Sequence, residues 1–186
     1  MNNKGFVLAE TLLVSAIILL TFTLLYKNGI PLINEYIRVR NYDDMDTVYI
    51  ANLFQQILVS DDNYMDILNQ TNASEYLDLT NCSRLDNVNL CQKYKDMNEI
   101  GANDRIILSI NRTDVLNKVS QKYSTDRDLN EYVTYLKNKN SEGSVSNHVI
   151  IISRTIDTKK KVIEGAQIKD EIKQVNKFAS VDLWGE

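Results

Sequence analysis

An uninterrupted apolar block near the start of the chain constrains its fold more than any other feature. The block FVLAETLLVSAIILLTFTLLY occupies residues 6–26 and carries one charge, Glu10. At ~1.5 Å rise per residue, a helix of this length measures roughly 31 Å, which matches the hydrocarbon core of a bilayer. The rest of the chain is too polar to surround such a rod on all sides. The block therefore predicts a membrane-spanning helix rather than a buried core helix.

A cleaved secretory signal peptide is the main alternative for this block. Signal peptides combine a positively charged start, an apolar stretch of about 7–15 residues and a small-residue cleavage site. Here the apolar stretch is longer, only Lys4 supplies a side-chain positive charge before it, and Tyr26-Lys27-Asn28-Gly29 follows it. These features favour an anchor over a signal peptide.

The composition excludes several classes of function. The chain has 186 residues, one His, two Cys and a formal net charge of −4. A single His argues against multi-His metal centres and Ser-His-Asp hydrolases, and the acidic balance argues against general nucleic-acid binding. The sequence contains neither a Gly-rich phosphate loop nor a nucleophile elbow. We therefore expect a protein that is not an enzyme and that holds no cofactor or metal.

Glu10 is unusual for its place in the sequence. A carboxylate inside a spanning helix costs on the order of 2.5–3.5 kcal/mol at the membrane centre, and such residues usually have a partner. The run Lys4-Gly5-Phe6-Val7-Leu8-Ala9-Glu10, followed by the apolar block, resembles the processing site of type IV prepilins and pseudopilins. The resemblance covers roughly residues 4–30.

This resemblance implies specific roles for three residues. In the family, a dedicated membrane peptidase removes a short leader that ends in Gly, which implies cleavage between Gly5 and Phe6 and N-methylation of Phe6. It also implies that Glu10 meets the N-terminal amine of a neighbouring subunit and fixes the axial stagger, because two charges in hydrocarbon are tolerated when paired. The implied partners are other pilin-like subunits, the prepilin peptidase, and a filament assembly ATPase with its membrane platform.

The resemblance implies a structural role for the whole chain. It indicates a minor pilin or pseudopilin of a type IV pilus-like, type II secretion or DNA-uptake filament. Family members keep the leader in the cytoplasm and export the C-terminal head, so the filament lies at the cell surface or in the periplasm; Lys4 gives the same orientation by the positive-inside rule. The alternative is a single-pass anchored extracytoplasmic binding or sensor protein that does not polymerise and needs neither Glu10 nor cleavage after Gly5.

The sequence after the block predicts a second, amphipathic stretch of helix. Apolar residues spaced three and four apart over residues 32–59 indicate one apolar face that docks on a head, although the acidic residues at 43–46 interrupt the pattern. Pro31 removes a backbone donor and predicts a kink or short break. The expected segments are a leader (1–5), a transmembrane helix (6–26), an amphipathic continuation (27–60) and an extracytoplasmic globular head (61–186).

The head is predicted to be α+β with an antiparallel sheet. Runs rich in Ile and Val indicate strands, and Thr-Asp pairs before periodic segments indicate helix starts. The expected elements are a loop over 60–75 with one helical turn near 64–68, a strand over 105–112, helices over 113–123 and 125–139, a polar loop over 140–147, a central strand over 148–156, a hairpin turn at 157–160, a strand over 161–168 and a helix over 169–178.

Two cysteines and one acidic cluster are candidates for further chemistry. In an exported domain, Cys82 and Cys91 favour a disulfide, with two free thiols as the alternative. An oxygen-rich cluster offers ligands for calcium, but it lacks the Gly and Glu of an EF-hand loop, so we expect a solvated loop. The members of this cluster are Asp61, Asp62, Asn63 and Asp66.

Two further features have a structural and a functional interpretation. His148 opens a predicted strand and is expected to be a packed side chain rather than a ligand. The run Lys159-Lys160-Lys161 is expected to be an exposed turn rather than a nucleic-acid contact.

Overall fold

The computed structural model describes residues 4–39, 41–140, 148–164 and 167–183. The chain divides into two compact units, Met1–Arg40 and Asn41–Glu186. The predicted polar loop over 140–147 lies outside the described residues apart from Asn140, which ends a helix.

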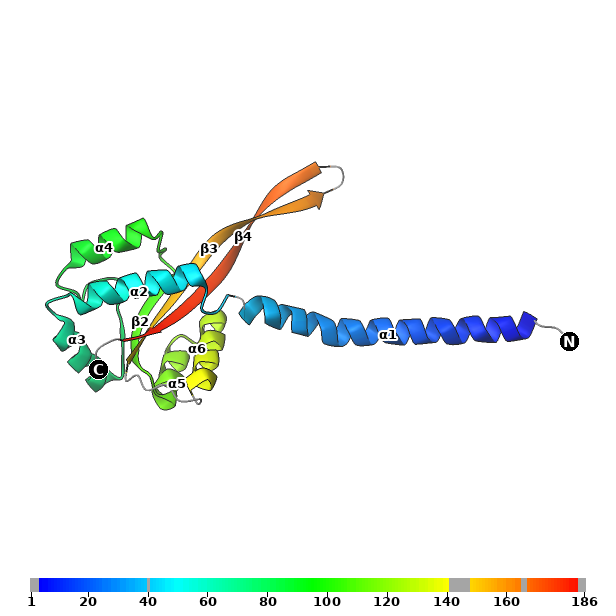
Figure 1. The fold of residues 1–186 in the computed structure, drawn as a ribbon, viewed down its shortest axis with the longest axis horizontal. Coiled ribbons are helices and arrows are strands. Elements are labelled where there is room, and N and C mark those ends of the chain that lie inside the picture. The colour runs from blue at the N-terminus through cyan, green and yellow to red at the C-terminus, as the bar shows by residue number, and fades with distance from the viewer. Residues whose placement is uncertain (1–3, 40, 141–147, 165–166, 184–186) are drawn as a thin grey trace. The chain divides into compact units, whose positions relative to one another are not determined.

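The first unit is one helix, α1, from Lys4 to Val39 (blue in Figure 1). It runs through Pro31 without interruption, so of the predicted kink or short break the break is wrong. A proline inside a helix removes one backbone hydrogen bond, and here the bonds on either side of it are kept.

The predicted amphipathic continuation is two helices rather than one. α1 ends at Val39, and α2 (Met45–Val59) begins after the segment 41–44. Asp43 in that segment has a φ of 50°, a left-handed conformation that a helix cannot contain. The acidic run that interrupts the sequence pattern is therefore the place where the helix is broken.

The second unit is built on a four-stranded antiparallel sheet, which confirms the predicted α+β class. The strand order is β1-β2-β3-β4. β3 is an inner strand, as the sequence predicts, and it pairs Ile151 with Ile107 of β2 and with Ser180 of β4. The strands are β1 (Tyr76–Asp78), β2 (Arg105–Ile110), β3 (His148–Glu164) and β4 (Gln167–Asp182).

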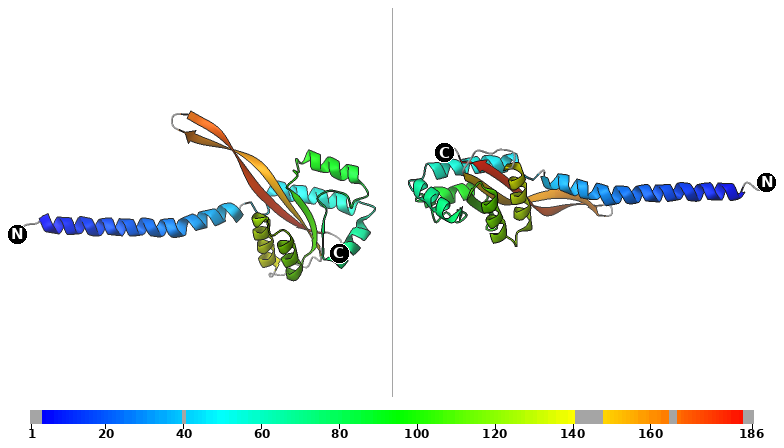
Figure 2. Two further views of the ribbon diagram at one scale, coloured as in Figure 1. Left: turned by 180° about the vertical axis from the view of Figure 1, so that it is seen from behind. Right: turned by 90° about the horizontal axis from the view of Figure 1, so that it is seen from below.

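Helices cover both faces of this sheet (Figures 1 and 2). One face buries Ile106, Leu108 and Ile150 against α2, α3 (Tyr64–Ser74) and α4 (Val88–Met97). The opposite face buries Ile107 and Ile151 against α5 (Thr113–Lys122) and α6 (Arg127–Asn140). Because both faces are buried, the inner strands are continuous apolar runs rather than alternating ones.

Several predicted elements of the head are confirmed and others are wrong. β2, α5, α6 and the start of β3 lie within a few residues of their expected positions. The expected loop over 60–75 contains the full helix α3, and neither α4 nor β1 was predicted. The expected hairpin turn at 157–160 and helix over 169–178 are both strand, because β3 continues to Glu164 and pairs along its length with β4.

Candidate functional site

The residues implied in processing lie at the start of α1. Gly5 and Phe6 are in its first turn, and Glu10 is exposed in the following turn. Positions four residues apart lie on the same face of a helix, about one turn apart. The α1 geometry thus places the Glu10 carboxylate on the face that carries position 6.

α1 presents an apolar surface on all sides. Glu10–Ile33, a stretch of 24 residues, is long and apolar enough to cross a membrane, and none of it is buried within the protein. Leu12, Leu19 and Phe22 are each more than three-fifths exposed. Such a rod is stable in lipid or against other apolar helices, and it is costly in water.

The hydroxyl groups of this stretch bond to the helix itself. Ser15 Oγ donates to the carbonyl of Thr11 (2.7 Å), and Thr21 and Thr23 donate to Ile17 and Leu19 (both 2.8 Å). These bonds spare the three hydroxyls an unpaired state in hydrocarbon. Glu10 cannot be neutralised in this way, because a carboxylate has no proton to donate to a carbonyl.

The segment 41–44, directly after α1, is fastened to β4. The amide of Phe178 donates to the carbonyl of Asn41 (3.0 Å), and the amide of Asp44 donates to the carbonyl of Phe178 (3.4 Å). Tyr42 and Phe178 form a parallel bridge between these bonds. The start of the head is therefore paired with the last strand of the sheet.

Asp43 is the centre of a polar cluster in this segment. Its carboxylate accepts hydrogen bonds from the hydroxyls of Tyr132 (2.8 Å) and Tyr135 (3.1 Å) and from Lys139 Nζ (2.9 Å). Burial, together with the nearby Asp43 charge, raises the pKa of Tyr132, so that its hydroxyl remains a donor. The cluster joins the segment after α1 to α6, and nothing in the sequence pattern pointed to it.

Aromatic rings surround this cluster. Tyr42 packs edge-on against Tyr132 with ring centroids 5.1 Å apart, and Tyr132 stacks on Phe178 at the same separation. Tyr42, Tyr132 and Phe178 are all buried. The Asp43 side chain is one-quarter exposed, and hydrogen bonds are stronger in such a partly buried position than in water.

Asp44 adds an ion pair to the same segment. Lys177 Nζ lies 2.9 Å from Asp44 Oδ1, and both side chains are about one-fifth exposed. Burial alone would raise the pKa of Asp44, but the hydrogen bond and charge of Lys177, with smaller help from Thr47, together lower it below its ordinary value of 3.8. The ion pair therefore stabilises the fold while Asp44 is ionised.

The lowered pKa of Asp44 predicts that this residue's contribution to stability is lost in acid. A carboxyl whose pKa is lowered by folding stabilises fully above its unfolded pKa and loses this effect as the pH falls through its folded pKa. Asp44→Asn should therefore destabilise the head at pH 7, and the difference from wild type should shrink below pH 3.8. Urea unfolding at several pH values measures it, with the exposed Asp46→Asn as the matched control. An Asp44→Asn effect that persists undiminished in acid would contradict the ion pair.

The structure joins Cys82 and Cys91 in a disulfide, the pairing that the sequence favours. Their Cα atoms are 5.9 Å apart, and both residues are buried in the core beside α2. The bond ties the turn after β1 to α4. This part of the chain has little apolar pattern of its own, so the bond supplies a constraint that packing does not.

Removing this disulfide should destabilise the head measurably. We expect Cys82→Ala with Cys91→Ala to lower the free energy of unfolding by about 2–3 kcal/mol, since the bond restricts the unfolded chain. Urea unfolding with and without a reducing agent measures the effect, and the reductant should shift the wild type but not the double variant. Alkylation of both thiols in unreduced wild-type protein would contradict the prediction.

The acidic cluster near residue 61 is organised around Asp61 as an acceptor. Asp61 is buried, and its carboxylate accepts from the amides of Asn63 (3.0 Å), Asp86 (3.1 Å) and Asn87 (3.1 Å). These bonds hold the turn before α3 against the start of α4. Asp61 therefore differs from the expected solvated residue, and its role is structural. No group of three or more potential metal ligands occurs among the residues described.

The fold also shows where His148 and the lysine run 159–161 lie. His148 is buried at the start of β3, and its Nε2 lies 3.1 Å from Asn72 Oδ1, which fits the expected packed residue. The lysine run 159–161 is inside β3 rather than in a turn. The expected turn at this run is therefore wrong, because the three lysines belong to a strand.

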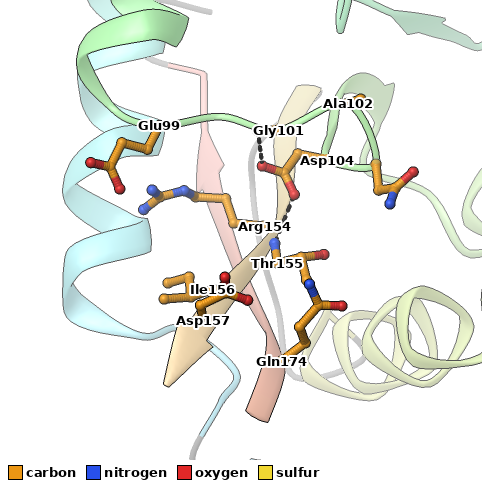
Figure 3. A pocket seen from close by; sticks show the side chains of 10 residues that line it. Glu99, Gly101, Ala102, Asp104, Arg154, Thr155, Ile156, Asp157 and Gln174 are labelled. Carbon is orange, nitrogen blue, oxygen red and sulfur yellow. Dashed lines mark hydrogen bonds between the residues drawn. The ribbon is translucent and has the colours of Figure 1, made fainter. Parts of the chain in front are cut away.

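A polar pocket of about 350 Å³ lies between the loop after α4 and strands β3 and β4 (Figure 3). Asp104, 1% exposed, accepts from the amides of Gly101 (2.5 Å) and Thr155 (2.7 Å) and so joins the loop to β3. Arg154 is 9% exposed, and its Nη2 donates to the carbonyl of Asn98. With Glu99 also at the wall, carboxylates outnumber this guanidinium, which disfavours an anionic ligand.

Comparison with protein-family models, with curated proteins and with solved structures found no match to this chain.

Proposed function

We propose that this protein is a structural subunit of a type IV pilus-like filament, a minor pilin or pseudopilin. The observation that carries the proposal is the apolar part of α1 over residues 6–33, unburied from Glu10 to Ile33, in which the one carboxylate is Glu10, four residues after Phe6. A helix with this surface is suited to storage in a bilayer and to burial in a bundle of similar helices.

Cleavage after Gly5 would prepare α1 for assembly. It leaves an ammonium group on Phe6, and this group carries a positive charge at the membrane-spanning end of the helix. Glu10 of an adjacent subunit supplies the opposite charge, and a pair of opposite charges costs far less in hydrocarbon than two separate ones. Because only one axial stagger brings the two groups together, the pair sets the register between subunits.

The remaining features are consistent with an exported head. The Cys82–Cys91 disulfide suits an oxidising compartment outside the cytoplasm. The segment 41–44 pairs with β4, so the first residues of the head belong to its folded core. In this role the protein performs no reaction; the peptidase, the assembly ATPase and the membrane platform are its partners.

N-terminal sequencing after co-expression with a prepilin peptidase tests the proposal. We expect the mature chain to begin at Phe6, with or without a methyl group, and Gly5→Val to leave the leader in place because its side chain occupies the space beside the scissile bond that Gly leaves open. Retention of residues 1–5 by the wild type, with α1 in the membrane, would contradict the proposal and favour a single-pass binding protein.

A further inference from the structure

Arg154 carries a buried charge that has no ionic partner among the residues described. Its side chain is 9% exposed, and Nη2 donates to the carbonyl of Asn98. Nε is buried without a hydrogen-bond partner, and no described carboxylate forms an ion pair with the guanidinium. Burying a charge without a counter-charge is strongly unfavourable. The Arg154 guanidinium is therefore suited to an anion that the described part of the chain does not supply.

The polar pocket of Figure 3 brings this guanidinium within reach of a small molecule. β2 ends its pairing with β3 at Ser153, so the next residues of β3 border an open space instead of another strand. The space measures about 350 Å³, within the range of roughly 300–1,000 Å³ that is typical of small-molecule sites. Arg154 lines this space, and its side chain extends from β3 toward the loop that carries Glu99.

Two carboxylates at the pocket wall are also without partners in the described chain. Glu99 follows α4 and Asp157 belongs to β3, and neither side chain forms a hydrogen bond or ion pair with a described residue. In the view of Figure 3, Glu99 lies above the Arg154 side chain and Asp157 lies below it. Asp104 differs from both, because its two oxygens accept from the amides of Gly101 and Thr155. The pocket therefore offers one unpaired cation and two unpaired anions.

This set of charges discriminates between classes of ligand. A simple anion would pair with Arg154 but would be repelled by the carboxylates, and a simple cation would leave the buried guanidinium unpaired. A molecule with one carboxylate and two ammonium groups matches all three unpaired charges, and a carboxylate can accept two parallel hydrogen bonds from a guanidinium. The side-chain amides of Asn103 and Gln174 lie at the same wall and can hydrogen-bond to such a molecule.

We propose that this pocket binds a free basic α-amino acid, with lysine as the simplest example. The carboxylate of the ligand accepts hydrogen bonds from Arg154, and its two ammonium groups donate to Glu99 and Asp157. The ligand has a net charge of opposite sign to that of the pocket, in which three carboxylates surround one guanidinium. The pocket lies entirely within the second unit, so this inference goes beyond the proposed filament role and does not depend on it.

Isothermal titration of the full-length protein in detergent with L-lysine tests the pocket. We expect L-lysine to bind with a Kd of about 1 mM or tighter, and two related compounds to bind at least about tenfold more weakly. Cadaverine is lysine without its carboxylate, so it cannot pair with Arg154. L-glutamate keeps the α-amino and α-carboxyl groups but places a second carboxylate near Glu99 and Asp157.

Variants of the wall assign each charge. Arg154→Gln should weaken L-lysine binding at least about tenfold without weakening cadaverine binding, whereas Asp157→Asn should weaken both. Asp157 is exposed, so its variant tests the pocket even if Arg154→Gln does not fold. Asp170→Asn, an exposed position on β4 outside the pocket wall, is the matched control. The inference is overturned if L-lysine does not bind, if cadaverine binds as tightly, or if Asp157→Asn binds L-lysine as tightly as the control.

Discussion

Replacing Glu10 with Gln is expected to leave the protein in the membrane and to reduce its incorporation into mixed assemblies at least about tenfold, a loss of about 1.4 kcal/mol or more. The amide is similar in size to the carboxylate but carries no charge, so the ammonium of the adjacent chain would lose its partner in a medium of low dielectric constant. Because α1 stays apolar, membrane insertion should not change.

The measurement is the fraction of tagged Glu10→Gln chain that co-purifies with wild-type chain after co-expression with the peptidase. Glu10→Leu should give the same loss, since it also removes the charge. Ser15→Ala is the matched control, because its hydroxyl bonds only to the carbonyl of Thr11 and no partner chain is needed to satisfy it. Normal incorporation of both Glu10 variants would remove the proposed role of this carboxylate.

Tyr132→Ala is expected to lower the free energy of unfolding of the head by about 3–5 kcal/mol. Tyr132 is fully buried, stacks on Phe178 and donates to Asp43, so its truncation leaves a cavity and removes one donor from the carboxylate. Tyr132→Phe keeps the ring and loses only the hydroxyl bond, for which we expect about 1 kcal/mol.

The comparison of these two variants separates packing from hydrogen bonding. Proteolysis of the full-length chain in detergent over a series of urea concentrations reports the unfolding of the head. If Tyr132→Phe costs as much as Tyr132→Ala, the hydrogen bond to Asp43 rather than the ring packing holds α6 to the segment 41–44. If neither variant changes stability, the cluster makes no contribution.

The parts of the head that the sequence predicted correctly are those with a strong local pattern. β2 and the first half of β3 are rich in Ile and Val, and α5 starts at a Thr-Asp pair. The outer half of β3 with β4 was mistaken for a turn and a helix because its residues are polar and charged. Its strand conformation comes from cross-strand pairing, which no local propensity reveals.

In the candidate site, too, the sequence could predict only what is local along the chain. Gly5, Phe6 and Glu10 are close in sequence, so their spacing is visible in the chain itself. The partners of Asp43 are 89, 92 and 96 residues away, and only the packing of α6 and β4 brings them together. The α4 helix was missed because it is short and its second half is mostly polar; the disulfide at Cys91 ties its first half to the turn after β1.

The pairing of residues 41–44 with β4 has a mechanical consequence. When α1 is pulled, tension enters the head at Asn41 and passes within a few residues to Phe178, in the interior of β4. β4 is hydrogen-bonded to β3 on both sides of that point, so the strain is shared among many ladder bonds instead of opening the sheet from a free end. Tension applied at Asn41 therefore acts on the interior of a paired strand and does not peel β4 from its end.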